Sequence, residues 1–102
     1  MYYTYTLQSC RVATAMGDAM GAEGWDVVSA PIEFTDPRYA ERFARFPLHH
    51  SYLDVARMLP PQLRQATGQI RIPDEATSGD YDLVVVGSPT WWLTTCMPIR
   101  SY

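Results

Sequence analysis

The chain has 102 residues, enough for one domain and too few for two, since single domains usually run about 100 to 200 residues. With 47% hydrophobic and 19% charged residues the composition is globular, and a formal net charge of -3 argues against nucleic acid or an anionic membrane as a partner. No apolar run approaches the ~20 residues that span a bilayer, no basic and apolar leader opens the chain, and two cysteines are too few for a zinc site, so we expect a cytoplasmic protein without a metal.

The first part of the chain follows the order strand, helix, strand. Residues 2–6 are aromatic and β-branched, which predicts a strand. Residues 9–24 predict an amphipathic helix of about three turns, with apolar side chains at helical spacing and Ser9 as the N-cap. Residues 25–30 predict a second strand, with Pro31 behind it. This βαβ order implies parallel pairing of the two strands.

The segment 31–80 is less regular and is interpreted as a long helical crossover or insert. A short helix is expected over 36–46, because an Asp N-cap precedes a proline at the first helical position. A second helix is expected over 51–59, ended or kinked by the two prolines that follow it, and the alternative is that these prolines start another turn over 60–67. Residues 68–80 are expected to be extended and loop-like.

The last part of the chain contains a third predicted strand. Leu83–Val86 is a continuous apolar run, typical of a parallel strand that is covered on both faces. A loop follows at residues 87–92. Residues 93–102 are then expected to begin a helix, with Thr94 or Thr95 as its cap.

Two loops follow strands of the expected sheet at the end where parallel sheets bind ligands. In the first loop, Thr4, Thr6 and Ser9 place hydroxyl groups directly before a helix N-terminus. Backbone N–H groups and the helix dipole at that end favour an anion, so the loop could cradle a phosphate without Lys or Arg. The alternative is that these residues only cap the helix.

The second loop carries two adjacent tryptophans. Gly87 allows close backbone approach, Pro89 stiffens the turn, and Trp91 and Trp92 offer flat apolar faces beside backbone N–H groups. A planar aromatic ligand could stack there. The alternative is that both tryptophans cover the end of the sheet.

These two loops resemble those of a known family. The stretch "DLVVVGSPTWW" resembles the flavin-ring loop of flavodoxin-fold FMN-dependent oxidoreductases, and "TYTLQS" resembles their phosphate loop, T-x-T-G-x-T. The resemblance implies an α/β, flavodoxin-like three-layer fold with a parallel sheet. Strands 1 to 3 of that fold would be present and strands 4 and 5 missing, so residues 1–102 would be a single domain incomplete at its C-terminus.

The resemblance also implies a cofactor, FMN, and a role for each matching residue. Thr4, Thr6 and Ser9, with the amides of Leu7, Gln8, Ser9 and Cys10, would hold the phosphate. Ser88, Pro89, Thr90 and Trp91 would line the isoalloxazine ring, with Trp91 or Trp92 stacking on it. Leu7 stands where the family usually has Gly, which implies a different backbone geometry or weaker phosphate binding.

The implied function is electron transfer or NAD(P)H-linked reduction of a small acceptor, with no catalytic residue assigned. The alternative is a truncated flavodoxin-like fragment that binds no flavin, or a subunit completed by another chain. Apolar side chains of the long segment exceed what a crossover helix needs, so we expect a lid over the flavin or a homodimer contact. These side chains are Tyr39, Phe43, Phe46, Tyr52 and Leu53.

Overall fold

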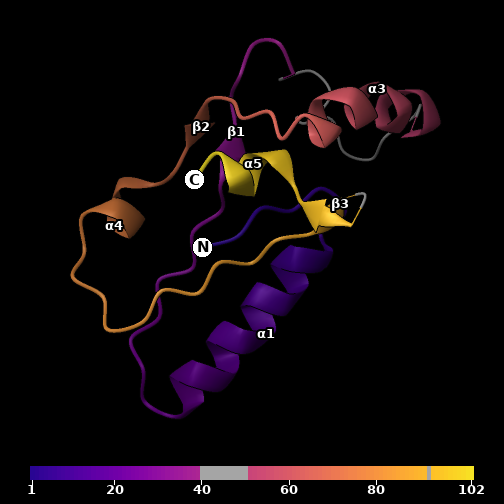
Figure 1. Cartoon of the computed structure of the whole chain (residues 1–102). Coiled ribbons are helices and arrows are strands. Elements are labelled where there is room, and N and C mark those ends of the chain that lie inside the picture. The colour runs from indigo at the N-terminus through magenta and orange to yellow at the C-terminus, as the bar shows by residue number, and fades with distance from the viewer. Residues whose placement is uncertain (40–50, 92) are drawn as a thin grey trace.

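The computed structural model describes residues 1–39, 51–91 and 93–102. Its helices are α1 (Gln8–Ala22), α3 (Ser51–Leu63), α4 (Asp74–Thr77) and α5 (Met97–Arg100). Its strands have two residues each and are β1 (Glu33–Phe34), β2 (Ile70–Arg71), β3 (Thr90–Trp91) and β4 (Thr94–Thr95). Helix α1 projects away from the part of the molecule that holds β1, α5 and β3 (Figure 1).

Helix α1 confirms the helix predicted from the spacing of apolar residues, but its cap differs. The residue before the helix is Leu7, and no side chain caps the first turn. Ser9 lies inside the helix, so its prediction as N-cap is wrong. At the other end Gly24 takes a left-handed φ of 90°, which lets the N–H of Trp25 return to the carbonyl of Met20 at 3.1 Å.

The two small sheets are antiparallel. Strand β1 pairs with β2, with Glu33 opposite Arg71 and Phe34 opposite Ile70. The Arg71 guanidinium also forms an ion pair with the Glu33 carboxylate. Strands β3 and β4 form a hairpin in which Thr90–Trp91 pairs with Thr94–Thr95. The segment predicted as loop-like over 68–80 therefore contains β2 and the short helix α4.

The predicted flavodoxin-like three-layer fold is wrong, because the described residues form no parallel sheet. Among the described residues, the expected strand 2–6 makes two single parallel bridges, from Tyr2 to Pro31 and from Tyr2 to Gly87, which lie one residue beyond the expected strands 25–30 and 83–86. A ladder needs successive paired residues, and the described backbone hydrogen bonds of the N-terminal segment to these two neighbours involve only Met1, Tyr2 and Tyr3.

The core forms where the N-terminal segment, β1, α3 and α5 meet. Its buried side chains are Tyr3, Ile32, Phe34, Met58, Cys96 and Met97. By contrast, Leu83–Val86 was expected to be covered on both faces, and its side chains are 40% to 54% exposed. The apolar run therefore lies outside the core.

Two helix predictions near the middle and end of the chain are modified. Helix α3 does not end at its prolines, since their carbonyls still accept backbone hydrogen bonds from Arg64 (3.1 Å) and Ala66 (2.9 Å). The helix expected after the tryptophans is α5, but it begins later than predicted, behind Cys96, because both candidate cap threonines lie in β4. Most of the helix predicted over 36–46, including Phe43 and Phe46, falls outside the described residues, as does the side chain of Tyr52.

Candidate functional site

The two loops singled out in the sequence begin side by side. The N–H of Tyr3 donates to the carbonyl of Gly87 at 3.1 Å, and the N–H of Gly87 donates to the carbonyl of Met1 at 2.8 Å. A Cβ at Gly87 would lie 3.1 Å from the Cβ of Tyr2, so this position favours glycine. A parallel sheet was expected to align the two loops. In the structure, the single bridges at Tyr2 bring them together instead.

The first loop enters α1 through a left-handed residue. Leu7 has φ 64° and ψ 1°, and its carbonyl accepts the first helical hydrogen bond, from Arg11 at 3.0 Å. Within the described chain, the N–H groups of Gln8, Ser9 and Cys10 donate no hydrogen bond to protein. These donors and the positive end of the helix dipole favour an anion at this end.

The hydroxyl groups of the first loop differ in their surroundings. The Oγ1 atom of Thr4 is buried and has no hydrogen-bond partner within the described residues. Thr6 is exposed at the turn into the helix, and Ser9 is half-buried. A buried hydroxyl without a partner costs free energy that an incoming hydrogen-bonding group would recover.

Cys10 lies on the side of α1 that faces the N-terminal segment. Its Sγ is 3.5 Å from the Tyr2 hydroxyl. This hydrogen bond, together with burial, raises the pKa of Tyr2. The Tyr2 hydroxyl therefore stays uncharged at neutral pH and adds no negative charge beside the helix N-terminus.

Trp91 carries the aromatic surface of the second loop. Its ring meets Tyr3 edge-to-face, with 5.9 Å between the ring centroids, and meets Tyr5 in the same way at 5.6 Å. Such contacts hold the half-buried indole in a fixed orientation beside the first loop. Trp92, the other predicted stacking residue, lies outside the described residues.

The residues before Trp91 form a turn that contacts the core. The Ser88 hydroxyl donates to the Pro89 carbonyl at 3.0 Å and lies 3.6 Å from the Sγ of Cys96. Burial raises the pKa of the Cys96 thiol, so it stays protonated at neutral pH. Thr90 is exposed in β3.

A buried glutamine positions the hairpin that carries Trp91, and the sequence did not single it out. Gln62 is 1% exposed, and its side-chain amide donates to Thr94 Oγ1 and to the carbonyls of Trp91 (3.3 Å) and Thr95 (2.8 Å). Its Oε1 accepts a hydrogen bond from Arg100 at 2.9 Å. One side chain of α3 therefore ties the hairpin to α5.

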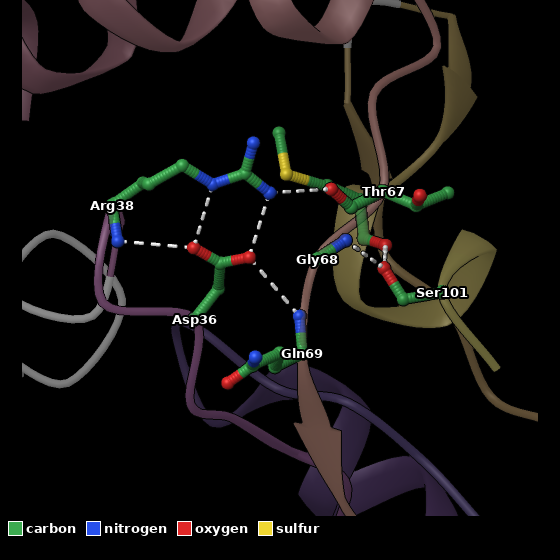
Figure 2. Close-up of polar contacts among 7 residues, drawn as sticks. Asp36, Arg38, Thr67, Gly68, Gln69 and Ser101 are labelled. Atoms are coloured by element: carbon green, nitrogen blue, oxygen red, sulfur yellow. Dashed lines mark hydrogen bonds and ion pairs between the residues drawn. The ribbon is translucent and has the colours of Figure 1, made fainter.

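A buried carboxylate organises the neighbouring turns. Asp36 is 3% exposed and accepts hydrogen bonds from the Arg38 side chain at 2.9 and 2.8 Å and from the backbone N–H of Gln69 at 3.2 Å (Figure 2). Arg38 holds the pKa of Asp36 well below its usual range. The N–H of Gly68 donates to the Ser101 hydroxyl at 2.9 Å, which links this turn to the end of α5.

A cavity of about 650 Å³ lies beside α1 and shares Gln8, Ser9 and Ser88 with the two loops. Its other walls are the rest of α1 and the extended segments 25–29 and 80–85, with Met1 and Tyr2. The sequence did not predict this cavity, because the valine run was expected to pack inside a sheet.

Comparison with protein-family models, curated proteins and solved structures finds no match to this chain. No helix in the described part is long and apolar enough to cross a membrane. Among the same residues, no three His, Cys, Asp or Glu side chains gather as a metal site. Function therefore has to be inferred from the local geometry.

Proposed function

We propose that the chain binds FMN between the N-terminus of α1 and the hairpin that carries Trp91. The observation that carries this proposal is the meeting of three features at one end of the N-terminal segment. They are the unused amides of residues 8–10, the buried hydroxyl of Thr4 and the fixed indole of Trp91.

The phosphate is proposed to bind at the start of α1. The amides of Gln8, Ser9 and Cys10 offer donors, and Thr4 or the exposed hydroxyl of Thr6 adds another. This set supplies hydrogen bonds and the helix dipole, as phosphate sites at helix N-termini do. The left-handed Leu7 gives the turn the conformation that glycine ordinarily supplies, which supports a phosphate loop in spite of the leucine.

The isoalloxazine ring is proposed to lie against Trp91, with Ser88, Pro89 and Thr90 along its edge. Bound FMN would supply the redox chemistry, while the protein would orient the ring and set its polar surroundings. Electron transfer, or NAD(P)H-linked reduction of a small acceptor, is the class of function proposed for this site.

Titration with FMN tests the proposal, with quenching of flavin fluorescence as the readout. Thr4→Val removes the buried hydroxyl at nearly constant volume and should weaken FMN binding by about tenfold, the effect of one lost hydrogen bond to a charged group. Thr35→Val changes an exposed threonine outside the site and serves as the matched control. Trp91→Leu should shift the flavin absorbance spectrum.

A second pair of variants separates phosphate binding from stability. Leu7→Gly relieves the left-handed backbone and should tighten FMN binding. Gln65 also has a left-handed φ, 52°, so Gln65→Gly gives a similar backbone change away from the site and should leave binding unchanged. The proposal is wrong if the protein retains no FMN. It is also wrong if neither Thr4→Val nor Leu7→Gly changes the affinity for FMN.

A further inference from the structure

Helix α3 presents an apolar stripe on the side away from the core. Among its described side chains, Met58 and Gln62 are buried, 6% and 1% exposed, and they lie one helical turn apart on the core side. Four apolar residues of the same helix are exposed, at successive spacings of three, four and three residues. They are Leu53, Ala56, Pro60 and Leu63, and we call this set the α3 seam.

The spacing of the α3 seam is that of a coiled-coil seam. At about 100° per residue, its four residues fall within about 80° of the helix surface. A helix that packs on a protein core presents an apolar face more than about 100° wide, while the a and d positions of a coiled coil form a narrower stripe. From Leu53 to Leu63 the seam rises about 15 Å. Its width and length therefore suit one partner helix.

The α3 seam is open to solvent along its length. Its two leucines, Leu53 and Leu63, are 64% and 68% exposed. Figure 1 shows α3 at one end of the molecule, apart from α1. The N–H of Arg64 donates to the carbonyl of Pro60 at 3.1 Å, so helical geometry continues to the end of the seam. A partner that covered the two leucines would gain the free energy of their burial.

One edge of the α3 seam is basic. Arg57 and Arg64 are exposed and seven residues apart, and each directly follows a seam residue. They therefore lie along the same edge, at positions that form ion pairs with the partner helix in coiled coils. Among the described residues, no carboxylate forms an ion pair with Arg64. A helix with acidic residues at the facing positions would be complementary in charge.

A second copy of the chain is a poor fit to this basic edge. In an antiparallel pair of α3 helices, the arginine edges of the two copies would face each other and repel. In a parallel pair, each arginine edge would face the other edge of the partner seam, where Leu59 and Ala66 offer no carboxylate. The charges therefore favour a different protein over a homodimer.

We propose that the α3 seam binds an amphipathic helix of a partner protein, with apolar residues at coiled-coil spacing and acidic residues beside them. The partner helix covers Leu53 and Leu63 and places its carboxylates along the edge that holds Arg57 and Arg64. Gln62, which ties the hairpin of Trp91 to α5, lies on the core side of α3. The interaction therefore does not depend on FMN binding.

The test uses an acidic peptide made of three repeats of Glu-Leu-Ala-Ala-Leu-Glu-Gln, acetylated and amidated at its ends. Its leucines occupy the a and d positions, and its glutamates flank them on both sides. The glutamates repel one another between peptide copies, so the free peptide should have little helix. Circular dichroism should show a gain of helix on mixing with the protein, and anisotropy of a fluorescein-labelled peptide should give the affinity.

Two control peptides test the two sources of recognition. Replacement of every glutamate by lysine should weaken binding by about tenfold or more, since it sets like charges against the arginine edge. Replacement of every leucine by serine should abolish binding, because nothing then covers the seam leucines. Equal binding of all three peptides would overturn the proposal.

Three variants of the protein test the location. Leu53→Asp and Leu63→Asp place a charge in the seam at exposed positions, so both should fold and both should lose peptide binding. Leu83→Asp is the matched control, because Leu83 is 54% exposed and lies outside α3, and it should bind like the wild type. Loss of binding in Leu83→Asp, or its retention in both seam variants, would overturn the proposal.

An exchange of charge tests the orientation of the basic edge. Arg64→Glu should weaken binding of the glutamate peptide by about fivefold and should strengthen binding of the lysine peptide by a similar factor. Arg11→Glu makes the same change at an exposed position in α1 and should leave both affinities unchanged. If Arg64→Glu moves the two affinities in the same direction, the proposed pairing is wrong.

Other occupants of the seam give distinct outcomes. A dimer in gel filtration that Leu63→Asp dissociates, with no uptake of peptide, would assign the seam to a second copy of the chain. Sedimentation with vesicles of phosphatidylserine and phosphatidylcholine, lost in Leu63→Asp and again without uptake of peptide, would assign it to a membrane surface. Either result would overturn the proposal. Binding of one glutamate peptide to each monomer supports it.

Discussion

The two sides of the Tyr2 bridges differ in how apolar residues are used. On the core side, Tyr3 and Met97 are 4% and 0% exposed, and the buried Gln62 side chain joins the hairpin to α5 by hydrogen bonds. Beside α1, Val84 and Val85 are 51% and 40% exposed, and the backbone of Val84 makes no hydrogen bond within the described residues. Apolar composition is high in both regions, so composition alone does not create a core.

The difference arises from hydrogen bonding as much as from hydrophobicity. The core is closed by side chains that pair with the backbone of distant turns, such as Gln62 and Asp36. No backbone hydrogen bond of the described residues joins the extended segments 25–29 and 80–85 to each other. A buried region needs partners for its backbone as well as apolar side chains.

The largest loss of stability is expected where the core network is broken. Gln62→Ala removes the hydrogen bonds to the hairpin and to Arg100 and leaves a void where a side chain 1% exposed had packed, so it should cost about 3 kcal/mol. Urea unfolding measures this loss. Arg64→Ala, at an exposed position next to the same helix, should change stability by less than about 0.5 kcal/mol.

A smaller loss is expected at Gly68, where the backbone passes close to the core. A Cβ there would lie 2.5 Å from Cζ of Phe34 and 2.8 Å from Oδ2 of Asp36. Gly68→Ala should therefore destabilise the protein by about 2 kcal/mol through displacement of these groups. Gly21→Ala is the control, because a Cβ at Gly21 meets nothing within 4 Å and alanine favours the helix.

The buried carboxylate makes the core side sensitive to acid. The pKa of Asp36 in the folded protein lies below its unfolded value of about 3.9. Asp36 therefore stabilises the fold fully above about pH 3.9, and this stabilisation is lost as the pH falls toward the folded pKa. Asp36→Asn should lower the thermal midpoint at pH 7 and flatten its decline below about pH 5. A wild-type midpoint that stays constant down to pH 2 would contradict this.

The smallest effect is expected in the extended segment beside α1. Val84→Ala removes atoms that are already half exposed, so unfolding free energy should change by less than about 0.5 kcal/mol. Met58→Ala, at a core position 6% exposed, should cost about 2 kcal/mol. If Val84→Ala and Met58→Ala lower the free energy of unfolding equally, the distinction between the core and the segment that holds Val84 is wrong.

Local sequence signals predicted local structure well. Helix α1 was predictable, because the signals that define it, the spacing of its apolar residues and the glycines near its end, lie within the segment itself. For α3 the two prolines left two interpretations open, an end at residue 59 or a further turn over 60–67. The structure has one helix that runs through both prolines to Leu63. The left-handed Leu7 was unpredictable from its residue type, since leucine rarely adopts that conformation.

Contacts between distant segments were the part that the sequence could not supply. A continuous valine run is typical of a buried parallel strand, but whether Leu83–Val86 is buried depends on what lies beside it. The meeting of the two candidate loops was expected, yet the structure achieves it through single bridges at Tyr2. The roles of Gln62 and Asp36 depend on partners about thirty residues away.

The core joins residues that are far apart in the sequence, and this has a consequence for biosynthesis. Met1 bonds to Val85, 84 residues along the chain, and Tyr3 packs with Cys96 and Met97. During translation, Tyr3 is made well before Cys96 and Met97. Helix α1 can form early, but the core has to wait until residues 96 and 97 have been synthesised, so the nascent chain displays its apolar segments until then.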